Sequence, residues 1–460
     1  MSVSSDTPDA PVPRLTPLAA MAIIVGIVIG AGIFKTPSMV AGVTGDAGWM
    51  MVAWVCGGAI SLAGALCYAE LASTYTHAGG DYHFLARAFG KPISFLYAWA
   101  KVMVINTGSI ALLAFVFADY MSKVLHLGAH STAIWAMGIV LLLTIVNLIG
   151  LKTASWVQSL LTMIEIAGLL LVAIAGFYLA GDAPASPAYF SSTPSLGMFG
   201  LAMVFVLLTY GGWNEAAYIS AEVRGGRRAI VPVISISILV LTLIYVLVNF
   251  ALLCGLGLKG LSEGNAVAAD VVGKAMGPIG ERILSLFVAT AALTSINATM
   301  IVGARANYAL GKDWPALSFM GHWNARHSSP ARALWVQSGI SLALVVFGLW
   351  QADGFSAMVE FTAPVFWFFL FLVGLSVFVM RARDPLTERP FKVPLYPMTP
   401  VIFCLTCAYL TYSSISYAAS KNAVSISMWV MAAGITALLL MQWLTPRKLS
   451  DKAGLASIKD

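Results

Sequence analysis

The stretch Gly26–Pro37 lies in a long apolar run but holds three glycines and a proline in twelve residues. Glycine and proline both disfavour a continuous helix. In hydrocarbon, a backbone N–H or carbonyl without a partner is costly. The stretch is therefore predicted either to stay helical against packed neighbours or to be unwound beside a cavity, where its peptide groups would bind a ligand.

A second apolar run carries a similar interruption. Between Phe205 and Glu215, the pair Gly211-Gly212 is followed by the polar residue Asn214. If spans one to five and six to ten are two copies of one unit, the two interruptions fall at corresponding places. Taken singly each is an ordinary helix kink, but a matched pair is typical of a transporter site between inverted repeats.

The chemistry of such a site follows from its peptide groups. A half-helix that begins at Gly32 presents N–H groups and a positive dipole end, which suit a carboxylate. Carbonyls freed at Val28, Leu208 and Gly211 suit an ammonium group. A site that offers both favours a zwitterion such as an amino acid.

Two charged residues lie well inside other apolar runs, where charge is expensive and usually functional. Lys101 and Glu165 differ in depth by about 3 Å at 1.5 Å of rise per residue. One interpretation is a fixed ion pair, since an unpaired partner would be costly. The other is that Glu165 takes up and releases a proton or helps to hold a cation, with Ser295 lining the same pocket. The two are not exclusive.

Two further charges flank the interruptions. Glu215 begins the inner half of the second interrupted run and would stabilise that helix N-terminus, which favours a structural role over a direct substrate role. Lys35 follows the first interruption on its outer side. A snorkelling or locally paired lysine is favoured there over a charge that attracts carboxylates.

The composition of the chain is that of a membrane protein. It has 460 residues, of which 59% are hydrophobic and 10% charged, against roughly a quarter charged in soluble domains. Twelve apolar runs are long enough to cross about 30 Å of hydrocarbon, which predicts an all-α polytopic protein. They lie near residues 17–43, 48–71, 92–119, 132–150, 154–180, 196–221, 229–257, 283–303, 333–351, 355–380, 397–419 and 424–444.

The positions of lysine and arginine predict the orientation. Of 26 such residues, 19 fall in the tails and loops on the side of the N-terminus and 5 on the opposite side, with Lys35 and Lys101 inside spans. Basic residues are enriched in cytoplasmic loops. Residues 1–14 and 446–460 are therefore predicted to be cytoplasmic tails of a protein of the bacterial inner membrane. The net charge of +6 reflects this bias and not binding to nucleic acid.

Several classes of protein are disfavoured by what the sequence lacks. All five cysteines fall in apolar runs, and the CxxC pair Cys404 and Cys407 has no second pair, so neither a disulfide nor a metal site is expected. The sequence has no P-loop, no nucleophile with a neighbouring base and no metal-ligand cluster, so nothing in it indicates an enzyme. It also has no series of pore-lining residues, which a channel would need. No cofactor is expected beyond a coupling proton or sodium ion.

Four segments carry a resemblance to a known family. The sequence resembles the amino acid–polyamine–organocation superfamily, and within it the L-type amino acid transporter-like permeases, from about residue 16 to 335. The segments are Gly30-Ala31-Gly32-Ile33-Phe34 with Pro37, Tyr210-Gly211-Gly212-Trp213-Asn214, Glu222–Pro232, and Ser295-Ile296-Asn297 with Arg305.

The resemblance implies the leucine-transporter fold. Two inverted five-helix repeats would occupy residues 15–181 and 182–392, with helices 1 and 6 broken, and helices 11 and 12 would occupy residues 393–445. A bundle of helices 1, 2, 6 and 7 would rock against a scaffold of helices 3, 4, 8 and 9. The implied function is transport of neutral L-amino acids by alternating access, by proton coupling or exchange. The alternative is an amine or polyamine carrier.

The resemblance also assigns residues to the substrate. Its carboxylate would bind at the backbone of Ala31 and Gly32, and Ile33 is a further substrate-binding residue. Its amine would lie at the carbonyls of Val28, Leu208 and Gly211, with Asn214 nearby.

Three positions depart from the family pattern. Leu208 stands where members often have an aromatic gate, so strongly cationic substrates are disfavoured. Glu165 stands where many relatives have a lysine, close to a sodium site of sodium-coupled cousins. The outer segment Ser122–Ser131 has no cysteine, so no disulfide-linked heavy chain is expected.

Overall fold

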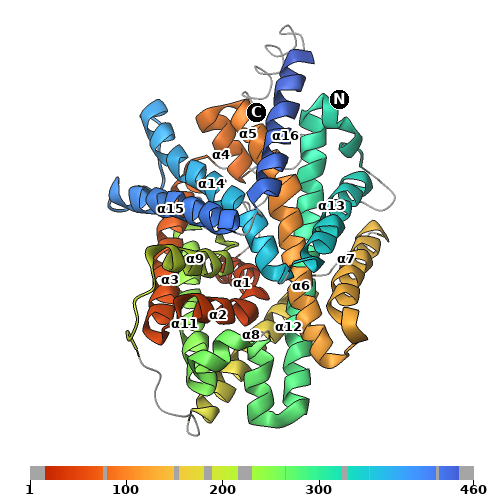
Figure 1. Cartoon of the computed structure of the whole chain (residues 1–460). Helices are drawn as coiled ribbons and strands as arrows, with labels where there is room; N and C mark the ends of the chain where they lie inside the picture. The colour runs from red at the N-terminus through yellow and green to blue at the C-terminus, as the bar shows by residue number, and fades with distance from the viewer. Residues whose placement is uncertain are drawn as a thin grey trace, which may run out of the picture.

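The computed structural model describes residues 16–75, 80–149, 155–180, 189–215, 230–264, 266–323, 330–351, 353–420 and 424–444. Every regular element in these ranges is a helix (Figure 1). The α-helices are α1 (Pro17–Val28), α2 (Gly32–Thr44), α3 (Ala47–Thr74), α4 (Gly80–Phe89), α5 (Lys91–Ala100), α6 (Asn106–Val124), α7 (Ser131–Ile149), α8 (Ser155–Leu179), α9 (Leu196–Thr209), α11 (Ile230–Glu263), α12 (Val267–Asp313), α13 (Ala331–Leu349), α14 (Gly354–Arg383), α15 (Met398–Ser420) and α16 (Val424–Leu444). Shorter turns are η1 (Lys101–Ile105), η2 (Gly128–His130), η3 (Trp213–Glu215) and η5 (Pro315–Met320).

The predicted all-α polytopic class is confirmed. Within the described ranges, 8 helices are long and apolar enough to cross a membrane. They are α3, α5 to α6, η2 with α7, α11, α12, α13, α14 and α15. The first predicted run is divided between α1 and α2, and three others contain the shorter apolar helical stretches Met163–Leu179, Leu196–Thr209 and Ser427–Leu440. The count of twelve spans therefore remains a prediction.

The chain is helical well beyond two of the apolar runs. α11 extends to Glu263 and α12 begins at Val267, so most of the outer connection between the two runs is helical. Each helix turns at a glycine with positive φ, Gly257 at 67° and Gly277 at 74°. Glycine adopts this backbone without strain, so the long helices change direction there.

The helix of the third run is not regular. Residues Lys101–Ile105 form a π-helical turn, in which the Asn106 N–H donates to the Lys101 carbonyl. Such turns appear mostly inside α-helices and frequently at functional sites. This one places the only two charged or amide side chains of the segment, Lys101 and Asn106, at its two ends.

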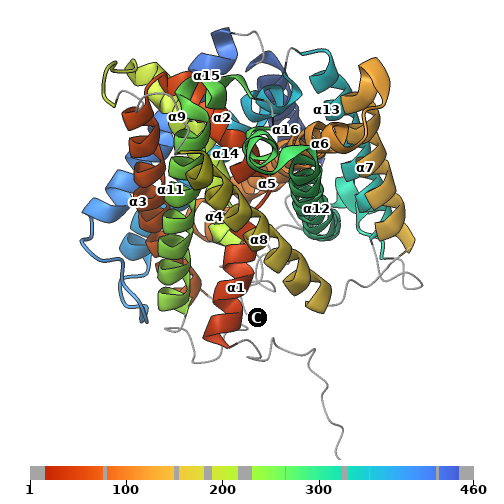
Figure 2. The ribbon, with the colours of Figure 1, turned by 90° about the horizontal axis from the view of Figure 1, so that it is seen from below.

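The helices form two groups (Figure 1). α1, α2, α3, α9 and α11 pack on one another on one side, and α6, α7, α12 and α13 pack together on the other. The view in Figure 2 shows α3, α11 and α1 running roughly side by side on one flank and α12 and α7 on the other. The interrupted helices therefore face the second group.

A single carboxylate joins two outer segments of the first group. Asp46 caps α3 by accepting hydrogen bonds from the N–H groups of Gly48 and Trp49 at 2.8 and 3.0 Å. It also accepts from the N–H groups of Phe190, Ser191 and Ser192, which precede α9. Burial alone would raise the pKa of Asp46, but these hydrogen bonds outweigh burial and lower the pKa to about 2.

Candidate functional site

The first predicted interruption is present. α1 ends at Val28 and α2 begins at Gly32, and between them the Gly30 N–H donates to the Val28 carbonyl at 2.8 Å. Within the described part of the chain, the N–H groups of Gly32 and Ile33 have no hydrogen-bond acceptor. Such orphan donors at a helix N-terminus form an anion-binding site.

The second interruption is present as well. α9 ends at Thr209, and the chain turns at Gly212. The φ of Gly212 is 105°, a value that glycine adopts without strain. The Gly211 N–H donates to the Leu208 carbonyl at 3.1 Å. Neither interrupted run continues as an intact helix past its glycines.

Hydrogen bonds join the two interruptions. The Tyr245 hydroxyl of α11 lies 2.9 Å from the Val28 carbonyl and 3.4 Å from the Thr209 carbonyl, which end α1 and α9. The Thr209 hydroxyl donates to the Thr36 hydroxyl of α2 at 2.8 Å. The ends of the broken helices are thus held at a fixed separation by side chains that are at least nine-tenths buried.

A cavity of about 400 Å³ lies between the interruptions and the second group of helices. This volume is within the range of small-molecule sites, roughly 300–1,000 Å³. Among the predicted substrate residues, those that line it are Val28, Gly32, Leu208, Gly211 and Asn214. Ala31 and Ile33 are fully buried next to Gly32, and neither lines the cavity. Lys101, Glu165 and Ser295 also line the cavity.

The predicted pairing of Lys101 with Glu165 is not formed in this structure. Among the residues that the structure describes, Glu165 makes no ion pair, and its Oε2 is buried without a hydrogen-bond partner. A buried carboxylate without a partner is costly as an anion. The side chain of Glu215 lies outside the described part of the chain.

Lys35 is locally paired, as predicted. Its Nζ lies 2.9 Å from Asp119 Oδ2 of α6, and its side chain is only 1% exposed. Next to this pair, the Tyr120 hydroxyl donates to the Phe34 carbonyl at 2.7 Å. These contacts cover the outer side of the cavity with α2.

Sequence reasoning missed several residues at the site. Thr36, Thr209 and Asn106 line the cavity, and Tyr245 holds the interruptions, yet each is an ordinary residue for its helix. Glu360 is a further acid inside a span, 6% exposed in α14. The rule that singled out Glu165, charge within an apolar run, would also have found Glu360.

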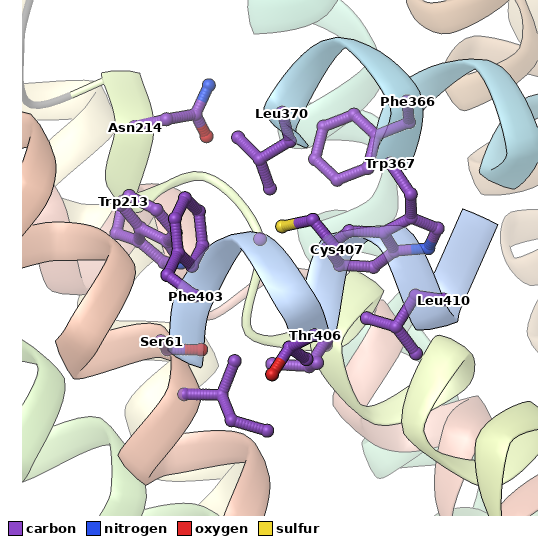
Figure 3. Close-up of a pocket in the computed structure, with 13 residues that line it drawn as sticks. Ser61, Trp213, Asn214, Phe366, Trp367, Leu370, Phe403, Thr406, Cys407 and Leu410 are labelled. Carbon is purple, nitrogen blue, oxygen red and sulfur yellow. The ribbon is translucent and has the colours of Figure 1, made fainter. Parts of the chain in front are cut away.

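A second, much smaller cavity adjoins the first (Figure 3). Its volume is about 10 Å³, room for about one water molecule. Trp213 and Phe403 lie at one end, with ring centroids 6.2 Å apart, and Trp367 lies at the other. It shares Gly211 and Asn214 with the large cavity, but is too small to hold an amino acid.

The C-terminal ends of α3 and α14 are joined by another buried ion pair. Arg381 Nε lies 2.7 Å from Glu70 Oε1, and Arg389 Nε lies 3.5 Å from the same oxygen. Glu70 is 3% exposed and also accepts a hydrogen bond from the Val393 N–H at 2.7 Å. These contacts join the first group of helices to α14.

The fold and the site together define a class of protein: a multi-pass helical membrane protein with two broken helices facing one central cavity. Residues 15–439 match the family model described as amino acid permease. The chain belongs to this family, and so to the amino acid–polyamine–organocation superfamily, as its motifs predicted. The family is one of transporters, so the chain is not an enzyme.

Named relatives are similar along most of the chain. The b(0,+)-type amino acid transporter 1 of Rattus norvegicus is 29% identical, over 86% of this chain and 82% of its own length. The serine/threonine exchanger SteT of Bacillus subtilis is 26% identical, over 84% of this chain and 87% of its own length. The cystine/glutamate transporter of Pongo abelii is 26% identical, over 87% of this chain and 80% of its own length.

Proposed function

We propose that the protein carries neutral L-amino acids across the membrane by alternating access. The observation that carries this proposal is the pair of interruptions at Val28–Gly32 and Thr209–Trp213, both facing the 400 Å³ cavity. Peptide groups of both signs meet there, as a zwitterion requires. The names of the bacterial serine/threonine exchanger and the b(0,+)-type transporter support amino acids as the substrate class.

In this proposal the carboxylate binds at the unpartnered N–H groups of Gly32 and Ile33, beside Ala31. The amine binds at the carbonyls of Val28, Leu208 and Gly211, with Asn214 beside them. Because the Val28 carbonyl already accepts from Gly30 and Tyr245, the amine must replace one of these donors. Substrate binding is then coupled to the contact that holds the two interruptions together.

The wider architecture is part of the proposal. Twelve spans would form two inverted five-helix repeats, residues 15–181 and 182–392, followed by two helices in 393–445. Both tails would face the cytoplasm at a bacterial inner membrane. We propose no disulfide-linked partner, because the segment Ser122–Ser131 has no cysteine.

Glu165 supports a role for a proton or a sodium ion. It lines the substrate cavity and has no ion-pair partner among the described residues. The transport cycle would be proton-coupled uptake or exchange, with Lys101 and Ser295 on the same cavity wall. The same carboxylate favours the second candidate, an amine carrier, because it could bind a second ammonium group.

Counterflow in liposomes tests the proposed substrate class. We expect saturable counterflow of a labelled neutral amino acid, with competition by unlabelled neutral amino acids, measured with and without a pH gradient. Competition by amines alone would identify the amine carrier. An ohmic current in a planar bilayer would show a channel and overturn the carrier proposal.

Glu165→Gln tests the coupling role. We expect this variant to lose the pH dependence of uptake and uphill accumulation while retaining exchange. Glu281→Gln is a matched control, because Glu281 pairs with Lys123 away from the cavity, at 3.1 Å. If pH dependence and uphill uptake both survive in Glu165→Gln, the proton role is excluded.

A further inference from the structure

Amide side chains from two neighbouring helices meet at Gly303 of α12. A Cβ atom on Gly303 would lie 2.6 Å from Gln337 Oε1 and 2.9 Å from Asn106 Nδ2. Both amides therefore sit against the bare backbone of Gly303, where any larger residue would displace them. Asn106 belongs to α6 and Gln337 to α13, and both helices pack on α12.

A third amide lies one turn along the same face. Asn307 is four residues after Gly303, and helical side chains lean toward the N-terminus of their helix, which brings the Asn307 amide back toward Gly303. Asn106, Gln337 and Asn307 are 8%, 0% and 1% exposed. We call these three residues around Gly303 the amide pocket.

Most hydrogen-bonding atoms of the amide pocket have no protein partner. Gln337 Nε2 donates to the Thr299 carbonyl at 3.3 Å. Asn106 Nδ2, Gln337 Oε1 and both amide atoms of Asn307 have none in the described part of the chain. Buried polar groups in folded proteins are nearly always hydrogen-bonded. Two of these four atoms lie against Gly303 and two belong to the residue one turn further along α12, and together they indicate a bound ligand.

The chemistry of these atoms selects the ligand. Two are N–H donors and two are carbonyl acceptors, all uncharged. A cation would need acceptors alone and an anion donors alone, whereas a ligand that both donates and accepts satisfies all four. Water is the smallest such ligand, and buried waters typically make about three hydrogen bonds to otherwise unsatisfied groups.

The pocket also has a supply of solvent. Asn106, Thr299 and Val302 all line the large cavity, so the amide pocket borders that cavity. We propose that the amide pocket binds ordered water, which links the cavity wall at Asn106 to Gln337 and Asn307 inside the second group of helices. This site is independent of the substrate and of the direction of transport.

A structure of the full-length protein with ordered waters resolved is the first test. We expect density within hydrogen-bonding distance of at least two of the three amides, in the presence and absence of substrate. A map that resolves waters elsewhere in the cavity but none at the amide pocket would overturn the proposal.

Asn307→Leu gives a second test through the sign of its effect on the Tm in detergent. If water satisfies Asn307, the apolar variant loses hydrogen bonds and strands the water, so the Tm falls by about 2 °C or more. If no water binds the Asn307 amide, replacing it removes a buried polar group that has no hydrogen-bond partner. The Tm then rises, which contradicts the proposal.

Asn307→Ala separates this effect from crowding by leucine. Alanine fits in the space of asparagine and leaves room for another water, so we expect its Tm loss to be no larger than that of leucine. Thr144→Val with Ser338→Ala is the matched control in neighbouring helices, because these two hydroxyls satisfy each other at 2.8 Å. If Asn307→Leu lowers the Tm but Asn307→Ala has the Tm of the native protein, the loss is caused by crowding, and the inference is overturned.

Discussion

Tyr245 uses one hydroxyl to hold the ends of two broken helices. Its ring also packs on Tyr210 and Trp54, with centroids 4.9 and 5.8 Å away, so Tyr245→Phe keeps the packing and removes only the hydrogen bonds. A typical hydrogen bond contributes about 1 kcal/mol. We therefore expect transport to slow about five- to tenfold, measured as initial uptake into liposomes, with little change in Tm.

Tyr210→Phe is the control for this prediction. The Tyr210 hydroxyl donates to the Trp54 carbonyl of α3 at 3.0 Å, so it joins its interruption to an intact helix and not to the end of the other broken helix. We expect a smaller effect on uptake. Equal losses in the two variants would show that the hydroxyl of Tyr245 has no special role at the interruptions.

Asp46 gives a prediction about pH. Its pKa is lowered from 3.8 to about 2 in the folded protein, so its carboxylate stabilises the fold fully above about pH 4. This contribution declines as the pH falls toward 2. Asp46→Asn is expected to lower the stability by about 1–2 kcal/mol at neutral pH, through the lost helix cap and loop contacts.

Thermal unfolding of Asp46→Asn and the native protein in detergent at pH 7, 5 and 3 measures this. The difference in Tm should be equal at pH 7 and 5 and smaller at pH 3. A difference that grows toward acid would mean that the folded state does not favour the ionised carboxylate.

At the scale of elements, glycines set how closely α3 approaches its neighbours. A Cβ on Gly58 would lie 2.3 Å from the Thr242 hydroxyl of α11, and one on Gly57 would lie 2.4 Å from Val206 of α9. Small residues at helix interfaces allow such close packing in membranes. Gly58→Val is expected to destabilise the protein by about 3 kcal/mol or to prevent folding, measured by Tm and by yield in the membrane.

Gly339→Ala is the matched control, because a Cβ there meets nothing within 4 Å. Alanine in a helix is intrinsically favoured over glycine, so the Tm should stay the same or rise slightly. A normal Tm in Gly58→Val would mean that α3 can move away from α11 at little cost.

The elements and the interruptions could be predicted because their causes are local. Long apolar runs must form helices in hydrocarbon. Glycine weakens a helix whatever the helix packs against, and this applies to Gly30, Gly32, Gly211 and Gly212. The partners of these segments could not be predicted. Lys35 and Asp119 are 84 residues apart in the chain, and Tyr245 and Val28 are 217 apart, so only the folded arrangement of the helices brings them together.

The depth argument for Lys101 and Glu165 failed for a related reason. Equal depth places two side chains in one layer of the membrane but not on facing sides of their helices. Both residues reach the same cavity without meeting.

For the whole molecule, the outer contacts of α2 with α6 hold the two groups of helices together. The Lys35–Asp119 pair and the Tyr120–Phe34 hydrogen bond both join α2 to α6, and Phe34 and Lys35 are each 1% exposed. In the proposed alternating-access cycle, these contacts would break when the cavity opens on the side where they lie. They would then set part of the free-energy difference between the two proposed states.

Replacing both charges, in Lys35→Met with Asp119→Asn, should shift the carrier toward the outward-open state without leaving a buried charge unpaired. A loss of about 1 kcal/mol corresponds to roughly a fivefold change in population. Ser109→Cys in the cavity, in a protein without the five native cysteines, reports this as faster labelling by an impermeant thiol reagent added outside. Lys123→Met, which removes an outer ion pair that does not involve α2, should leave the labelling rate unchanged. Equal rates in all three proteins would show that opening is limited elsewhere, and that the Lys35–Asp119 pair only stabilises the fold.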